Sequence, residues 1–321
     1  DGSTDNCAVN FRNISQSSFT CANIGNNNVV LTVTDGSGNI ATCATLVSVV
    51  DEIAPTALCQ DITATLGGLS LILPHSATNN GSADACGISS FSLFPNAFTC
   101  NDIGDNNVLL TVTDNSNNIS TCSSVVTIED NTAPSAICQS STIQLSVGGN
   151  GSITTGHIDN GSADACGIAG MTVTPNTFTC TDVGNVQVTL DVTDNNGNSR
   201  SCAATLTVQD NTPPTAICQP ATVQVGLTGS ATISTGDIDD GSSDNCNIAS
   251  MSVNPSSFTC GDIGDVTTTL TVNDDGGNSA SCTATVTVMD NTAPTALCLD
   301  LTIQLFAGSA SITTGDVDNG S

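Results

Sequence analysis

The 321-residue sequence contains no lysine, tryptophan or tyrosine, and its only cationic side chains besides two histidines are Arg12 and Arg200. Thirty acidic residues leave a formal charge of −28 at pH 7. Such a surface repels phosphate backbones and anionic lipids, so the sequence predicts neither nucleic acid nor direct membrane insertion. The charge attracts divalent cations, but acidic turns can also serve only to keep a long secreted polymer soluble.

Long hydrophobic runs and close cysteine pairs are missing as well. No apolar stretch approaches the ~20 residues that a membrane-spanning helix needs. No CxxC pair occurs, although zinc modules require such close ligand pairs. The sequence therefore disfavours both a membrane span and a metal–thiolate site.

Cysteine is abundant and regularly placed. The steps within each group of four cysteines are 14, 22 and 16 residues, and the groups recur every 79 or 80 residues. An even number of cysteines at fixed spacing predicts a disulfide framework and an oxidising, extracellular setting, on the cell surface or secreted. The sixteen residues are Cys7, Cys21, Cys43, Cys59, Cys86, Cys100, Cys122, Cys138, Cys166, Cys180, Cys202, Cys218, Cys246, Cys260, Cys282 and Cys298.

The same period divides the chain into domains. Four proline-containing segments, which begin at Asp51, Asp130, Asp210 and Asp290, each follow one alternating strand and precede another, as short stiff linkers do. The first and last residues of the sequence match the interior of other repeats, which predicts that it is part of a longer repetitive polymer. The predicted domains are a partial repeat at 1–50, full repeats at 51–130, 131–210 and 211–290, and a partial repeat at 291–321.

Within one period the pattern is that of β-strands. In the repeat 131–210, Val186, Val188, Leu190 and Val192 alternate with polar residues, and the turn 194–198 leads into a second alternating run. Such alternation, interrupted by Asn, Asp and Gly, predicts half-buried antiparallel strands and no helix. Six or seven strands in eighty residues predict an all-β chain of tandem immunoglobulin-like β-sandwich domains in an extended rod, with two disulfides per domain.

The sandwich also suggests how the cysteines pair. The first and last strands of such a domain lie side by side, and a 14-residue step can fold back on itself. The predicted bonds are Cys59–Cys122, Cys138–Cys202 and Cys218–Cys282 between first and last strands, and Cys7–Cys21, Cys86–Cys100, Cys166–Cys180 and Cys246–Cys260 locally. This pairing leaves Cys43 and Cys298, which we expect to be unpaired within this sequence.

The repeats resemble a known domain type. The run Asn-Thr-Ala-Pro-x-Ala-Ile/Leu-Cys and the turn Val-Thr-Asp-x-x-Gly-Asn, followed by a cysteine, are similar to the hyalin-repeat (HYR) immunoglobulin-like domain. The repeat sequences look most like those of giant surface proteins of gliding Bacteroidota, including gliding-motility adhesins. The resemblance covers the whole chain and implies a cell-surface or shed fibre that adheres or spans distance.

Acidic loops are the candidate metal sites. The loop 159–164 and its equivalents offer hard oxygen ligands, and each linker aspartate could add a carboxylate, which makes calcium the predicted cofactor. The loops are not EF-hands, and Asx turns would use the same residues without a metal, so both interpretations stay open. The candidate ligands are Asp51, Asp84, Asp130, Asp159, Asp164, Asp210, Asp239, Asp244 and Asp290.

Nothing in the sequence predicts catalysis. His75 and His157 occupy non-equivalent loop positions, and no GxSxG motif accompanies the many serines. The leading hypothesis is a non-catalytic repeat region of an adhesin or stalk, whose partners are surface polymers or neighbouring copies of the same chain. The alternatives are a self-assembling extracellular filament and a spacer of a secreted hydrolase.

Overall fold

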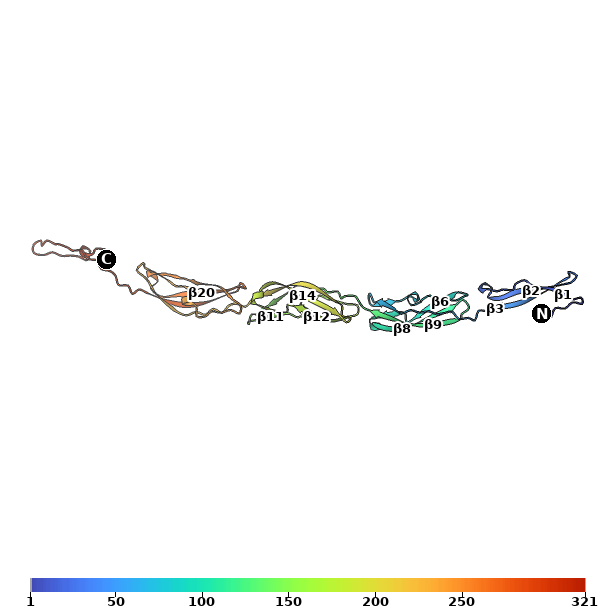
Figure 1. The fold of residues 1–321 in the computed structure, drawn as a ribbon. Coiled ribbons are helices and arrows are strands. Elements are labelled where there is room, and N and C mark those ends of the chain that lie inside the picture. Colours follow the sequence, from blue (N-terminus) through green and yellow to red (C-terminus); the bar gives the residue numbers. More distant parts are fainter. Residues whose placement is uncertain (1, 321) are drawn as a thin grey trace. The chain divides into compact units, whose positions relative to one another are not determined.

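The computed structural model describes residues 2–320, whose strands are drawn in Figure 1. The chain divides into two compact units. One unit comprises the residues up to 136 together with 162–171 and 192–200. The other comprises 137–161, 172–191 and the residues from 201 onward. The regular structure is almost entirely β-strand, and the strands recur with the period of the cysteines.

The repeat 51–130 shows how the sequence pattern becomes a sandwich. Its longest strands, β8 (Gly104–Asp114) and β9 (Ile119–Glu129), form an antiparallel hairpin. On β8 the alternate residues Val108, Leu110 and Val112 are buried, while Leu109 and Thr111 between them are at least partly exposed. Period-two patterning therefore places one face of the hairpin in the core, as the sequence predicts.

Two sheets make up this repeat. The larger has the strand order β4-β9-β8-β6, and the smaller pairs β5 with β7. The additional strands are β4 (Ile62–Thr65), β5 (Ser70–Ile72), β6 (Ile88–Phe94) and β7 (Ala97–Thr99). The first strand lies beside the last as expected, but the prediction of purely antiparallel strands is wrong, because β4 runs parallel to β9. After β4 the chain crosses to β5 in the other sheet instead of returning by a hairpin.

The next two repeats have the same order of elements. Their larger sheets are ordered β10-β15-β14-β12 and β16-β21-β20-β18, and their smaller sheets are β11-β13 and β17-β19. The strands of 131–210 are β10 (Ser141–Gln144), β11 (Asn150–Ser152), β12 (Ile168–Thr174), β13 (Thr177–Thr179), β14 (Gly184–Asp194) and β15 (Ser199–Gln209). Those of 211–290 are β16 (Ala221–Gln224), β17 (Ser230–Thr232), β18 (Ile248–Asn254), β19 (Ser257–Thr259), β20 (Gly264–Asp274) and β21 (Ser279–Met289).

The core of each complete repeat is small and aliphatic apart from one phenylalanine. Phe98, Phe178 and Phe258 are 1–2% exposed, and each lies in the smaller sheet directly before the last residue of its strand. In the repeat 51–130 this ring belongs to a cluster with Leu66, Val108 and other aliphatic side chains. The fold is therefore a tandem array of immunoglobulin-like β-sandwich domains, with six disulfides over three complete repeats.

The ends of the chain hold the partial repeats. The first has one three-stranded sheet of β1 (Val9–Ile14), β2 (Gly25–Asp35) and β3 (Ile40–Val49), in the order β1-β2-β3. The last contains one helical turn, α2 (Thr314–Val317).

Single helical turns are the second departure from the predicted all-strand pattern. The 3-10 helices are η1 (Cys21–Asn23), η2 (His75–Ala77), η3 (Cys100–Asp102), η4 (Thr155–His157), η5 (Cys180–Asp182) and η6 (Cys260–Asp262), and α1 (Thr235–Ile238) is a short α-helix. Most begin with a capping box, as where Thr179 and Asp182 bond each other's backbone at η5. These local side-chain bonds stabilise one turn without any helical periodicity.

Candidate functional site

The junctions between successive repeats carry the most distinctive chemistry of the described chain. At the end of β13, the backbone N–H and hydroxyl of Thr179 donate to Asp182 Oδ2 over 2.8 and 3.1 Å. This box holds the turn that begins with Cys180. The sulfur of Cys180 bonds Cys246 of the following repeat, with 5.3 Å between the two Cα atoms.

The following repeat presents its cysteine from a short acidic loop. Asp244 Oδ2 accepts the N–H of Cys246 over 2.8 Å, and Asn245 Nδ2 reaches the carbonyl of Ser146 in the preceding repeat over 3.4 Å. Gly149, at φ +71°, lies against this contact, and a Cβ there would come within 2.7 Å of both Cys180 Sγ and the carbonyl oxygen of Asn245. Only glycine fits so close an approach with a positive φ.

The disulfides thus fall into two classes. Cys59–Cys122, Cys138–Cys202 and Cys218–Cys282 lie within single repeats, as the sequence predicts. The other three cross a linker and join successive repeats: Cys21–Cys86, Cys100–Cys166 and Cys180–Cys246.

The predicted local bonds are therefore wrong. Cys86–Cys100 and Cys166–Cys180 do not form, because the 3-10 turn after each short strand places its cysteine beside the acidic loop of the next repeat. Cys7–Cys21 and Cys246–Cys260 do not form either, because Cys21 bonds Cys86 and Cys246 bonds Cys180. Within residues 2–320, Cys43 and Cys298 have no disulfide partner, as expected, and Cys7 and Cys260 have none either.

Carboxylates gather next to the inter-repeat bonds. Three linker aspartates, Asp51, Asp130 and Asp210, each have a buried Oδ2 atom without a hydrogen-bond partner among the described residues. Asp130 is 7% exposed and Asp210 is 3% exposed. A buried carboxylate oxygen without a partner is costly, so a cation or an ordered water at these positions would be favourable.

The arrangement at Asp210 is the most complete. Ligand atoms of Asp210, Asp244 and Asp274 all lie within 4.8 Å of one another. Asp244 Oδ1 and Asn245 Oδ1 are also buried without a hydrogen-bond partner in the described chain. Asn245 Nδ2 donates to Asp210 Oδ1 over 3.1 Å, so this amide lies beside the carboxylates. Three acidic side chains thus converge there, beside one side-chain amide.

The two equivalent groups are poorer in oxygen. Asp51 with Asp84, and Asp130 with Asp164, approach to the same limit of 4.8 Å, each together with the sulfur of Cys86 or Cys166. These sulfurs are bonded in disulfides and are not thiolate ligands. Each of these groups therefore offers two carboxylates.

Six of the nine aspartates predicted as ligands are thus brought together in pairs. Asp159, Asp239 and Asp290 do not belong to these groups. Asp239 accepts the N–H of Ser242 over 3.0 Å in an Asx turn, which holds its pKa below the usual value, the Ser242 side chain making the largest contribution. Asp290 accepts the N–H of Thr292 over 2.9 Å.

Asp274 was missed because it lies in a hairpin turn far from the linker in sequence. Its equivalents, Asp114 and Asp194, are buried. Burial tends to raise their pKa, but the side-chain amides and backbone N–H groups of Asn118 and Asn198 outweigh it and hold the pKa below the usual value. The Asp-x-x-Gly-Asn pattern of residues 274–278 could have revealed Asp274, had the turn been considered as a neighbour of the linker.

The asparagine that ends this turn ties the hairpin to the linker before the same repeat. Asn118 Nδ2 donates to the carbonyl of Asp51 over 3.0 Å. Asn198 and Asn278 make the equivalent bonds to Asp130 and Asp210, over 3.0 and 3.1 Å. The turn thus fixes the linker backbone from which Asp51, Asp130 or Asp210 projects.

The histidines have structural contacts. The His75 ring stacks on Phe91 with 5.0 Å between the ring centroids. The Nδ1 atom of His157 accepts the N–H of Thr154 over 3.1 Å in the cap of η4. Neither contact forms part of a nucleophile–base pair.

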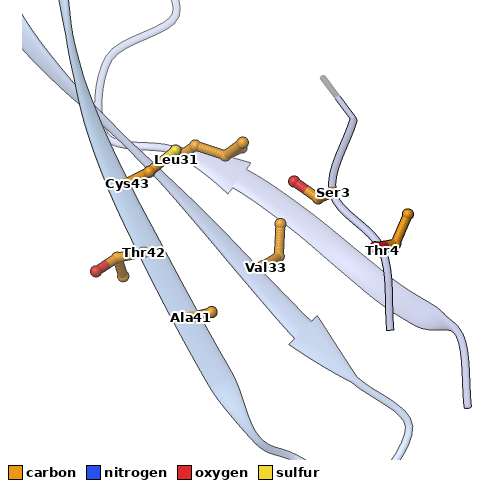
Figure 2. Close-up of a pocket in the computed structure, with 7 residues that line it drawn as sticks. All are labelled: Ser3, Thr4, Leu31, Val33, Ala41, Thr42 and Cys43. Carbon is orange, nitrogen blue, oxygen red and sulfur yellow. The ribbon is translucent and has the colours of Figure 1, made fainter. Parts of the chain in front are cut away.

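A hollow of about 240 Å³ lies on the partial repeat at the N-terminal end (Figure 2). Leu31 and Val33 of β2 and Ala41 and Cys43 of β3 line it. Leu31 pairs with Cys43 as Leu110 pairs with Cys122 in the complete repeat, where Leu110 is fully buried. The hollow is therefore the uncovered core face of an incomplete sandwich.

The fold and its cross-linked junctions define a class: disulfide-bonded, immunoglobulin-like tandem repeats. The chain is 31% identical over 248 residues to hyalin from Strongylocentrotus purpuratus, a match that covers 71% of this chain and 20% of hyalin. The chain thus spans about a fifth of the relative's length. No family model matches the sequence.

Among solved structures, cadherin domains 1 to 4 of protocadherin gamma B7 match 84% of this chain and 84% of their own, at 13% identity and a TM-score of 0.29. An I-band fragment of titin matches 74% of this chain and 97% of its own, at 13% identity and a TM-score of 0.30. In residues 2–320, no helix has the length and apolarity to cross a membrane.

Proposed function

We propose that this chain is a non-catalytic structural repeat region of an extracellular adhesin or stalk, of the kind found in gliding-motility adhesins. The observation that carries the proposal is the covalent joining of successive repeats by Cys21–Cys86, Cys100–Cys166 and Cys180–Cys246, in addition to the linkers. Such bonds persist in an oxidising compartment, on the cell surface or after secretion. The likeness to hyalin supports the same setting.

The sheet edges favour a stalk over lateral assembly into a filament. One outer strand, β4, is only four residues long, and the other, β6, carries a register shift between Ile88 and Ser90. Short or bulged edges are poor templates for pairing with another chain. Surface polymers are accordingly the favoured partners, and neighbouring copies of the chain the second candidate.

Imaging and sedimentation test this role. We expect the oxidised chain to be a monomer at micromolar concentration and to be elongated in negative-stain electron micrographs. Association that grows with concentration would favour the filament instead. A compact particle would contradict both functions.

We further propose that each linker group binds Ca²⁺. Calcium prefers about six to eight oxygen ligands, among them carboxylates and amide oxygens. Asp210, Asp244 and Asn245 provide three buried oxygens without hydrogen-bond partners, and Asp274 lies beside them. The charge of −28 raises the local concentration of cations. The group at Asp210 is expected to bind more tightly than those at Asp51 and Asp130, because it has one more carboxylate.

Calorimetry on the metal-free chain tests the calcium proposal. Titration with CaCl2 is expected to release heat, and saturation at 100 times Kd stabilises the folded state by about 2.7 kcal/mol. Asp210→Asn should remove the tightest site. Asp240→Asn, which changes an exposed aspartate of the same repeat, is the control. Equal titrations of both variants and the wild type, or no heat at millimolar Ca²⁺, would show that the cluster is not a calcium site.

A further inference from the structure

The six disulfides close loops that overlap along the sequence. The three inter-repeat bonds enclose 65 or 66 residues each, and the three within repeats enclose 63 or 64. Each loop begins before the preceding one ends: 21–86 overlaps 59–122, which overlaps 100–166, and so on to 218–282. The two classes of disulfide therefore form one connected covalent network.

We propose that this network gives the chain a further function, which is to carry tension along a covalent path that bypasses most of the polypeptide. From Cys21 the path crosses to Cys86, follows the backbone to Cys100, and crosses again to Cys166. It then follows the backbone to Cys180 and crosses to Cys246. Only a 14-residue segment of each repeat lies on the path.

The extended lengths of the backbone segments show how much the disulfide path limits the extension of the chain under load. A repeat of about 80 residues that unfolds completely reaches roughly 260–290 Å, at ~3.3–3.6 Å per residue. A 14-residue segment reaches only about 50 Å by the same measure. The disulfide adds one crossing, with 5.1 to 5.3 Å between its Cα atoms. Tension on the ends thus cannot draw out the rest of the repeat.

The strands that form most of the core lie outside this path. In the repeat 51–130, the loaded segment from Cys86 to Cys100 contains the outer strand β6 and the short strand β7. The long hairpin of β8 and β9, which buries Val108, Leu110 and Val126, follows Cys100 and is not loaded. Its hydrogen-bond ladder bears no force until a disulfide breaks.

The bonds within repeats have a different place in the network. Cys59–Cys122 encloses the loaded segment 86–100, and Cys138–Cys202 encloses the segment 166–180. Cys218–Cys282 encloses the segment that follows Cys246. Every peptide bond between Cys21 and Cys282 therefore lies inside at least one loop. A single backbone cut in this range leaves the two parts joined.

Force spectroscopy on the whole chain, held at two attachment points beside Cys86 and Cys180, separates the two classes of bond. All variants carry Ser at the four unpaired cysteines to prevent bonds between molecules. Without Cys100–Cys166, the shortest route from Cys86 to Cys180 uses the bonds Cys59–Cys122 and Cys138–Cys202. That route contains backbone segments of 27, 16 and 22 residues, in place of two of 14.

Between these two points, the double variant Cys100→Ser/Cys166→Ser should therefore extend further than the parent chain by about 37 residues, or about 120–130 Å at ~3.3–3.6 Å per residue. The matched control, Cys138→Ser/Cys202→Ser, removes a disulfide of similar loop length and should leave the full extension unchanged. Equal extension of the two variants, or extension of the oxidised parent to its full backbone length, would overturn the proposal.

A second measurement does not depend on how well the variants fold. A protease recognition sequence inserted between Asn131 and Thr132 allows one cut in a linker that only Cys100–Cys166 spans. On non-reducing gels the cut parent and the Cys138/Cys202 variant should run as one band, and the Cys100/Cys166 variant as two. Separation of the parent without a reductant would contradict the network.

Discussion

At the scale of single residues, leucines three positions apart contribute very differently to stability. Leu66 is 1% exposed and packs in the cluster around Phe98, whereas Leu69 is 75% exposed. Removal of a buried leucine side chain loses transfer free energy and leaves a cavity. Leu66→Ala is therefore expected to destabilise the repeat 51–130 by about 2–5 kcal/mol. Leu69→Ala should change the free energy of unfolding by less than ~0.5 kcal/mol in urea denaturation. Equal effects would contradict the packing described for Leu66.

The turn aspartates make stability depend on pH. Burial tends to raise the pKa of Asp194, but the hydrogen bonds from Asn198 and Asn196 hold the pKa lower in the folded state than in the unfolded chain. The stabilisation is therefore complete above about pH 4, the range of an unfolded aspartate, and is lost as the pH falls through the folded pKa.

The variant Asp194→Asn tests this dependence. It should be less stable than the wild type at pH 7, and the difference should shrink towards pH 2 in urea denaturation. Asp191→Asn removes one charge from an exposed position on the same strand and serves as the control. A difference that stays constant with pH would show that the turn does not bind the ionised carboxylate preferentially.

At the scale of elements, the hairpin turn and the linker form one unit. Asn198 Nδ2 donates to the carbonyl of Asp130, and the Thr132 N–H donates to Asp130 Oδ1 over 3.0 Å. Asn198→Ala removes the first bond and should increase amide exchange in the linker about five-fold, the equivalent of ~1 kcal/mol. Asn196→Ala changes an exposed side chain of the same turn and should leave amide exchange in the linker unchanged. Hydrogen exchange of linker peptides, measured by mass spectrometry, distinguishes the two variants.

The elements also show what the sequence could predict. Alternation such as that of Val186 to Val192 was sufficient for the long strands, because one face of each is buried along its length. The three-residue strand around Phe178 was not foreseen, since alternation over three residues cannot be recognised. The parallel first strand was missed because spacing alone does not reveal a crossover between sheets.

The cysteine pairing, too, could be predicted from the sequence only in part. Cys138–Cys202 follows from the adjacency of first and last strands, which any such sandwich shares. A spacing of 14 residues between two cysteines is compatible both with a local bond between them and with bonds to neighbouring repeats. What separates them is the single turn at Cys180 and the close approach at Gly149, and both depend on the neighbouring repeat. The contribution of Asp274 to the acidic cluster was hidden for the same reason.

At the scale of the whole molecule, the register of the cysteines should survive the removal of one repeat. Deletion of residues 131–210 leaves Cys100 followed by Cys246, which has the same role as Cys166. Mass-spectrometric mapping is expected to find a Cys100–Cys246 bond beside Cys21–Cys86, Cys59–Cys122 and Cys218–Cys282. Deletion of 131–190 keeps Cys202 without its partner Cys138 and should yield scrambled bonds. Scrambling in both deletions would show that the pairing depends on particular repeats.

The pairing rule has a consequence for inheritance. Every inter-repeat bond joins the same two positions of neighbouring repeats. Unequal crossing-over between two copies of the gene, if it is in register, adds or removes one whole repeat. Each cysteine in the interior of the product then still has a disulfide partner. An exchange out of register leaves a cysteine without its disulfide partner, and the product then misfolds more readily. Selection on the thiols alone would therefore keep the period constant while the number of copies drifts.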